Sequence, residues 1–224
     1  AVRPRRSLRI CFLAPYCQPP TTMDVATDID RILAYWFGEN PDAALTASAN
    51  QTLWWGADPT IDAQIRSRFA EFVEAAGRNE LAEWAQTPRG LLALILLTDQ
   101  FPRNMFRRTP RAFAFDAPAR AYCKHGIGRG FDLQLPLIQR VFLYLPLEHS
   151  ESLEDQNESV RLFSELAQLA APDQKALFEG YLTYAQRHRD IIVRFGRFCH
   201  RNSILGRPSR PEEEEFLRQP GSSF

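Results

Sequence analysis

The chain contains no apolar run long enough to cross a membrane. Its longest uninterrupted apolar stretch runs from Leu91 to Leu97, whereas a transmembrane helix needs roughly 20 residues. Hydrophobic residues make up 45% of the 224 residues and charged residues 24%, which is typical of soluble globular proteins. A chain of this length can bury a sizeable core within one large domain. The sequence therefore predicts a soluble protein without a membrane-spanning helix.

Cysteine is scarce. The four cysteines are Cys11, Cys17, Cys123 and Cys199. No two of them form a close CxxC pair, so the sequence shows neither a zinc-binding spacing nor a disulfide framework. Free thiols in a reducing compartment are the simplest interpretation. We therefore expect a cytoplasmic protein.

Lysine is nearly absent, and arginine carries the positive charge. Lys124 and Lys175 are the only lysines among 27 basic residues, which 27 acidic residues balance. Residues 1–23 contain four arginines and no acid, so the rest of the chain has a net charge of −4. Generic nucleic-acid binding needs a strong positive field. The mildly acidic body therefore argues against a nucleic-acid partner.

Motifs of the common cofactor and metal enzymes are also missing. The sequence has no GxGxxG, no Walker loop and no GxSxG, which are the signals for dinucleotide binding, phosphoryl transfer and serine hydrolysis. The ExxH pairs of di-iron bundles and the HExxH of zinc peptidases are absent too. We predict no cofactor and no metal site.

The first 22 residues differ from the rest. Their arginine-rich, acid-free composition is similar to that of export or transit segments, but the apolar part is short and is followed by Pro15, Pro19 and Pro20. We expect residues 1–22 to be a disordered extension, and an upstream start site with Met23 as the natural initiator would explain it. We expect residues 23–224 to form a single domain.

Helical periodicity follows directly after Met23. Apolar residues recur at three- and four-residue spacing in segment after segment, and start signals such as Asp58-Pro59 and Thr87-Pro88 separate them. Helices are predicted to run from Pro88 to Leu97, from Leu133 to Leu145 and from Asp173 to Phe195, and Ser209 to Glu212 fit a capping box. No segment alternates with the two-residue period of a strand. The sequence predicts an all-α fold of eight or nine helices in antiparallel pairs.

Three segments place hydrogen-bonding side chains among bulky apolar ones, at or just past the predicted helix ends. They are Asp99–Asn104, Leu145–Glu151 and Phe195–Asn202. Buried polar groups must be paired, because each costs a few kcal/mol if it is not. The segments therefore form either a structural network or a site.

Our first functional hypothesis is a cleft that binds a small anion. Several guanidinium forks that converge on one cleft would hold a phosphate or a carboxylate. The candidate ligand-binding residues are Asp99, Gln100, Arg103, Asn104, His188, Arg197, His200, Arg201 and Asn202. Arginines near helix C-termini also satisfy free carbonyl groups, so a purely structural role stays open.

Glu148 and His149 are the candidate catalytic residues. A histidine next to carboxylates could transfer protons near neutral pH. The alternative is that both pair with arginines and join helix ends, and the sequence favours it, because ion-pair networks of that kind are common. His188 lies on an apolar stripe with Ile192 and Phe195, which is typical of a core histidine with a hydrogen-bond partner.

Longer strings of the chain resemble a known family. The strings lie at Ala34–Gly38, Leu97–Asn104, Arg140–Glu151, Arg194–Phe198, His200–Asn202, Leu205–Arg207 and Pro220–Phe224. In this order they are similar to an uncharacterised bacterial family, domain of unknown function 924, with Cys199 where that family usually has proline. The resemblance implies a helical fold similar to tetratricopeptide-like arrays, and it implies no particular activity.

The second functional hypothesis is a scaffold. Helical arrays commonly hold a protein or peptide partner, and in that case the polar segments would only lock the helices. We expect the four tryptophans, Trp36, Trp54, Trp55 and Trp84, in the core rather than in a binding cage. Trp54 and Trp55 are the exception, because adjacent tryptophans should point in different directions, so one of the two could line a groove.

Overall fold

The computed structural model describes residues 25–222, and helices dominate this part of the chain. The α-helices are α1 (Val25–Phe37), α2 (Ala43–Trp55), α3 (Pro59–Gly77), α4 (Pro88–Ile95), α5 (Phe101–Met105), α6 (Asp116–Gly128), α7 (Leu137–Glu148), α8 (Leu153–Leu169), α9 (Lys175–Phe195) and α10 (Pro211–Leu217). Residues 25–222 include no β-strand. The all-α prediction is confirmed. The expectations for residues 1–22 and for Met23 lie outside the described residues.

Several helix ends follow from the capping residues that the sequence shows. Asp58 precedes α3 and accepts a hydrogen bond from the Thr60 N–H at 2.7 Å. Thr87 likewise accepts from the Gly90 N–H at the start of α4. Gly38 ends α1 with φ of +68°, a left-handed conformation that costs glycine little. These side chains satisfy backbone groups that a helix end leaves without partners.

Helix α2 is absent from the sequence prediction. Its sequence is rich in Ala, Ser, Thr and Gln and has no apolar stripe, so periodicity does not reveal it. The helix forms because Asp42 caps its N-terminus and because Trp54 anchors its C-terminal end in the core. The Trp54 indole N–H donates to the Trp36 carbonyl oxygen at 2.8 Å. Tertiary contacts therefore decide this helix.

The helix predicted to end at Leu97 continues to Met105, which corrects the sequence prediction. Residues Leu96–Gln100 form a wide π-helical turn, η2, that joins α4 to α5. The Phe101 N–H donates to the carbonyl of Leu96, five residues earlier. Pro102 has no N–H and would crowd an ordinary α-turn, and a π-turn is one way in which a helix accommodates such a break. Asp99 and Gln100 consequently lie inside a buried helix and not behind its end.

Helix α7 and the capping box of α10 also differ from the prediction. Helix α7 starts at Leu137, four residues later than expected, and continues through Pro146 to Glu148. Nine of its consecutive residues, 140–148, are buried, and packing on all sides overrides the proline signal. At the start of α10 the predicted box of Ser209 and Glu212 is replaced by one contact, in which the Arg210 N–H donates to the Glu213 Oε2 at 2.7 Å. Helix boundaries are sensitive to such one-residue choices.

Aromatic rings fill the centre of the helical core. Trp36 and Phe142 lie edge to face with centroids 5.6 Å apart, and Trp54 lies 4.6 Å from Phe142. Each such pair adds about 0.5–1.5 kcal/mol beyond the burial of its area. Trp36, Trp54 and Trp84 are buried, as expected of core residues, whereas Trp55 is half exposed. The Trp55 ring nevertheless stacks on Phe142 with centroids 5.7 Å apart, so the two adjacent tryptophans pack against the same ring.

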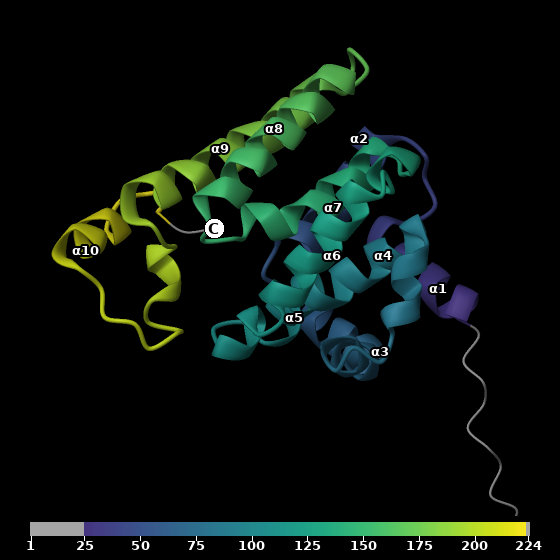
Figure 1. Cartoon of the computed structure of the whole chain (residues 1–224), viewed down its shortest axis with the longest axis horizontal. Helices are drawn as coiled ribbons and strands as arrows, with labels where there is room; N and C mark the ends of the chain where they lie inside the picture. The colour runs from purple at the N-terminus through teal and green to yellow at the C-terminus, as the bar shows by residue number, and fades with distance from the viewer. Residues whose placement is uncertain (1–24, 223–224) are drawn as a thin grey trace, which may run out of the picture.

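Helices α8 and α9 form a long antiparallel hairpin, and α10 packs near its far end (Figure 1). Helices α1 to α7 gather on the other side, where α7 contacts both α8 and α9. This arrangement brings the end of α7, the η2 turn and the chain after α9 towards one another. The regular stacking of a tetratricopeptide-like array stays a prediction. No helix in residues 25–222 combines the length and apolarity needed to span a membrane.

Candidate functional site

Most of the predicted polar residues meet in one cluster around His149. Asp99 and Gln100 come from the η2 turn, Arg103 from α5, and Glu148 and His149 from the end of α7. The other members are His188 on α9 and the residues His200 and Arg201 of the 3-10 helix η5 (Cys199–Arg201). Segments that are about 100 residues apart in the chain therefore share one polar centre. We refer to these eight residues, together with Asp116, as the His149 cluster.

The central contact joins His149 to Asp99. The His149 Nδ1 lies 2.8 Å from the Asp99 Oδ1, and the Asp99 side chain has no exposed surface. Burial opposes ionisation of Asp99, but the charges of Arg103 and His149 outweigh it and hold the pKa of the carboxyl well below its usual range. The ionised carboxylate accepts a hydrogen bond from the Nδ1–H group, so the Nε2 of a neutral His149 is left as the proton acceptor.

Two arginines share the carboxylate of Asp116. Arg103 donates from Nη1 to the Asp116 Oδ1 at 3.0 Å, and it also contacts the Asp99 Oδ1 at 3.1 Å. Arg201 donates from Nη1 to the His149 carbonyl at 3.1 Å and lies 3.5 Å from the Asp116 Oδ2. Burial and the nearby Arg103 charge lower the pKa of Arg201 to about 10. Both guanidinium groups stay protonated at neutral pH.

Two of their N–H groups have no acceptor. Among the described residues, Arg103 Nη2 and Arg201 Nε are buried and lack a hydrogen-bond partner. The Arg201 guanidinium is held in place by two rings, with its carbon 4.8 Å from the Phe113 centroid and 4.4 Å from that of Phe198. Buried donors without acceptors are rare in native proteins and call for an explanation.

The side chains of Glu148 and His149 have different partners, His188 and Asp99 respectively. The Glu148 Oε1 lies 3.2 Å from the His188 Nδ1, and that nitrogen is also 2.9 Å from the Tyr184 carbonyl. Because both neighbours accept hydrogen bonds, Nδ1 of His188 carries the proton. Burial lowers the pKa of His188 to about 3, so the ring is neutral. The prediction of a core histidine with a hydrogen-bond partner is confirmed.

Glu148 is expected to make the stability of the fold depend on pH. Burial, followed by the charge of Asp99, raises its pKa to about 8, above the value near 4.5 of an unfolded chain. The folded protein therefore binds an extra proton between these values, and stability falls as pH rises from about 4.5 to about 8, by at most about 1.4 kcal/mol per unit. Urea unfolding at pH 5, 6, 7 and 8 should show a smaller loss in Glu148→Gln than in the wild type.

A matched control for this experiment lies on α9. Glu179 is exposed on α9, so Glu179→Gln should keep the pH dependence of the wild type. If Glu148→Gln and the wild type lost stability in parallel over this range, Glu148 would not be the group that takes up the proton.

His200 belongs to the cluster because the charges of Arg201 and His149 act on its ring. Burial and the neighbouring Arg201 lower the pKa of His200 to about 4. Beside it Glu151 accepts from Arg207 Nη1 at 2.7 Å and from the Phe198 N–H at 2.8 Å. This contact holds the η5 segment against the end of α7. Glu151 and Arg207 therefore fix the position of His200 and Arg201.

Three of the predicted ligand-binding residues lie outside the cluster. Asn104 donates to the Asp62 Oδ1 at 3.0 Å and so joins α5 to α3. Arg197 and Asn202 both donate to the buried carboxylate of Glu213 at the start of α10. The carboxylates that accept these hydrogen bonds belong to Asp62 and Glu213, so the geometry supports a role in holding helices together.

Sequence reasoning missed Asp116 as a member of the cluster. An aspartate at the first residue of a helix is usually taken as a cap, and Asp116 indeed begins α6. Its side chain instead pairs with Arg103 and Arg201, which are 13 and 85 residues away. Only the fold brings these charges together. Among residues 25–222 no group of three or more His, Cys, Asp or Glu side chains could hold a metal ion.

Comparison with known proteins gives the chain a family. The family model described as "Bacterial protein of unknown function (DUF924)" matches residues 32–221. The chain belongs to this family. The matched range contains every residue of the His149 cluster. This confirms the resemblance that the sequence strings indicated.

A solved structure has the same fold as this member of the family. The protein described as "Structure of Protein of Unknown Function ATU0120 from Agrobacterium tumefaciens" is 36% identical, with a TM-score of 0.74. The match covers 87% of this chain and 99% of the Agrobacterium chain. No curated protein matches the chain. The relatives therefore support the fold and the family, and the site must be judged from its own geometry.

Proposed function

We propose that the His149 cluster binds a small anion that carries a phosphate or a carboxylate, and that His149 exchanges a proton with the bound molecule. The observation that carries this proposal is the 2.8 Å contact between Asp99 and His149 beside two guanidinium groups. A carboxylate that orients a histidine is a general arrangement for acid–base chemistry.

The exposure of the two partners supports a proton-transfer role for His149. Asp99 is fully buried, whereas 15% of the His149 side chain is exposed. Burial and Arg103 lower the pKa of His149, against the raising effect of Asp99. The ring is therefore neutral at pH 7 and can accept a proton on Nε2, while Asp99 stabilises the charge that then forms.

The arginines support the choice of an anion. The charges of Arg103 and Arg201 are balanced by the carboxylates of Asp99 and Asp116, which they face. The remaining donors, Arg103 Nη2 and Arg201 Nε, have no acceptor among the described residues. An anion oxygen beside them would supply that acceptor, and hydrogen bonds between charged groups contribute about 1.5–3 kcal/mol each.

Anion binding should strengthen as pH falls. A bound anion raises the pKa of nearby histidines, so the complex takes up a proton that the free protein lacks. His149 has a lowered pKa and His200 one of about 4 in the free protein. The affinity for phosphate should therefore rise as pH falls from 8 towards 6, and it should level off once the histidines of both states are protonated.

The experiment is a titration with inorganic phosphate. Calorimetry measures the affinity, and the histidine signals in NMR spectra report the site of binding. Phosphate should bind the wild type and shift the His149 and His200 signals, and Arg103→Gln and His149→Gln should each lose about tenfold or more in affinity. Arg89→Gln is the control, because Arg89 forms an exposed pair with Asp30. If neither phosphate nor acetate bound the wild type, or if the control lost as much affinity, the proposal would fail.

A scaffold for a protein or peptide is the second candidate function. Large apolar side chains are exposed on the α8/α9 hairpin, where Leu169 is 59% and Tyr184 52% accessible. The ion pairs of the His149 cluster would then only lock the helices, and the helices would stack in a tetratricopeptide-like manner. A partner that binds His149→Gln as well as it binds the wild type, together with a failed phosphate titration, would favour this candidate.

A further inference from the structure

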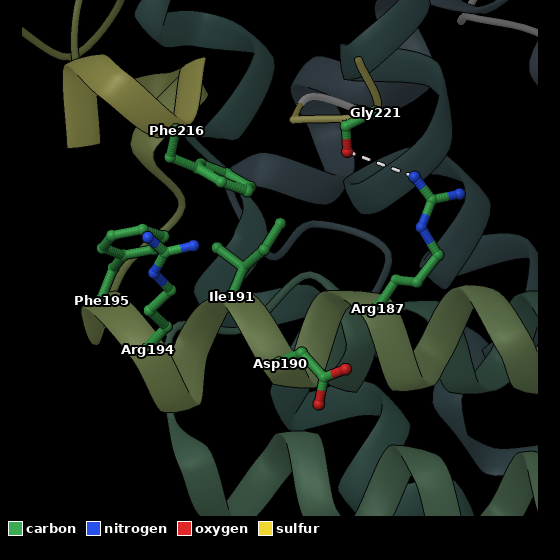
Figure 2. A pocket seen from close by; sticks show the side chains of 7 residues that line it. All are labelled: Arg187, Asp190, Ile191, Arg194, Phe195, Phe216 and Gly221. Carbon is green, nitrogen blue, oxygen red and sulfur yellow. Dashed lines mark hydrogen bonds between the residues drawn. The ribbon is translucent and has the colours of Figure 1, made fainter. Parts of the chain in front are cut away.

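A concave site lies between α9 and α10, away from the His149 cluster. It is a hollow of about 210 Å³ whose walls include Ile191, Phe195, Phe216 and Gly221. Figure 2 shows Ile191 and Phe216 pointing towards one another across the hollow, from α9 and α10 respectively. Its volume is below the range of pockets for drug-sized ligands, so the hollow suits a molecule of about ten non-hydrogen atoms.

Two arginines stand at opposite ends of this hollow. Arg187 and Arg194 lie on the same side of α9 as Ile191, because residues seven apart fall on one helix face. Arg187 donates from Nη2 to the Gly221 carbonyl at 3.2 Å and so closes one end (Figure 2). Gly221 allows this approach, since a Cβ there would come within 2.6 Å of that nitrogen.

Arg194 lies at the other end, over aromatic rings. Its guanidinium carbon is 4.6 Å from the Phe195 centroid and 5.6 Å from that of Phe216. Within residues 25–222 no carboxylate forms an ion pair with it. Stacking occupies the face of a guanidinium and leaves its N–H edge available for a carboxylate.

The acidic residue of the lining does not neutralise these charges. Asp190 points away from the hollow in Figure 2, and its side chain is 75% exposed. The hollow therefore combines apolar walls with the guanidinium of Arg194 at one end. Such a surface is complementary to a molecule with a flat apolar body and a negative group.

We propose that the hollow between α9 and α10 binds a small aromatic or branched aliphatic carboxylate. The apolar body lies between Ile191 and Phe216, and the carboxylate accepts hydrogen bonds from the edge of Arg194. Arg187 holds the Gly221 backbone as one wall. This site is separate from the anion site proposed around His149, and neither proposal depends on the other.

The test is an NMR titration of the full chain with phenylacetate, with phenylacetamide as the uncharged counterpart. Phenylacetate should shift the signals of Ile191, Phe195 and Phe216, and phenylacetamide should bind at least about tenfold more weakly. Arg194→Gln should weaken phenylacetate binding by a similar factor. Arg189→Gln is the matched control on the same helix, since Arg189 donates to Asn157 on α8 and does not line the hollow.

Each other outcome contradicts the proposal. The absence of shifts around Ile191 would exclude the site. Binding that survives Arg194→Gln but is lost in Arg103→Gln would place phenylacetate in the His149 cluster, which would support the anion site and overturn this one. Equal binding of the acid and the amide would show an apolar hollow without selection for charge.

Discussion

Replacing Glu213 by alanine is expected to lower the free energy of unfolding by on the order of 3 kcal/mol. The Glu213 side chain has no exposed surface. Its two oxygens accept from Arg197 Nε and Nη2 at 2.7 Å each, and from the Arg210 N–H at 2.7 Å. Alanine would leave a guanidinium and a helix-end N–H without acceptors. We expect a loss of stability near the lower end of the range for breaking a buried ion pair, because α10 lies at the edge of the fold.

The neighbouring Glu214 provides the control. It is exposed on the same helix and forms no ion pair within residues 25–222, so Glu214→Ala should change stability by at most about 0.5 kcal/mol. Urea unfolding measures both variants, and limited proteolysis reports whether the segment after Phe195 loosens first in Glu213→Ala. Equal stability of the two variants would show that the Glu213 contacts do not hold α10.

Replacing Asp99 by alanine should cost even more, about 3–5 kcal/mol. Asp99 is fully buried, and its carboxylate contacts Arg103 and His149 and accepts from the Gln100 amide at 2.5 Å. Without it two buried guanidinium groups, Arg103 and Arg201, share the single carboxylate of Asp116. The cost is therefore mainly that of a buried charge left without compensation.

A double-mutant cycle tests this explanation. In Asp99→Leu combined with Arg103→Met, the charge and its partner are both removed, so the loss of stability should be clearly smaller than the sum of the two single losses. Urea unfolding of the four proteins at pH 7 gives the coupling energy. Additive losses would mean that Asp99 and Arg103 do not depend on each other, in contrast to their 3.1 Å contact.

The comparison of sequence and structure separates local signals from long-range ones. The capping residues Asp58 and Thr87 and the terminating Gly38 were readable because each acts on backbone within a few residues of itself. Helix α2 was not readable, since it depends on the hydrogen bond from Trp54 to Trp36. The π-turn at Leu96–Gln100 was missed because no simple residue pattern specifies it.

The candidate site shows the same division. The three polar segments were visible in the sequence because charged and amide side chains stand out among apolar neighbours. The sequence did not reveal the partners of these side chains. His149 pairs with Asp99 and Glu148 with His188, across 50 and 40 residues of the chain. Asn104, Arg197 and Asn202 carry the same side-chain types as the cluster, yet they bind Asp62 and Glu213. Residue type cannot reveal which carboxylate a buried arginine will meet.

The sequence by itself determined that this protein is helical, which helix faces are buried and which segments place polar groups in the core. These properties follow from periodicity, capping and the cost of burying unpaired groups, and all of them act locally. The tertiary structure alone decided that Asp116 joins the cluster, that Asp99 orients His149, and that α9 and α10 enclose a hollow. Ion pairs and cavities depend on distances between residues far apart in the chain, and those distances exist only once the helices have packed.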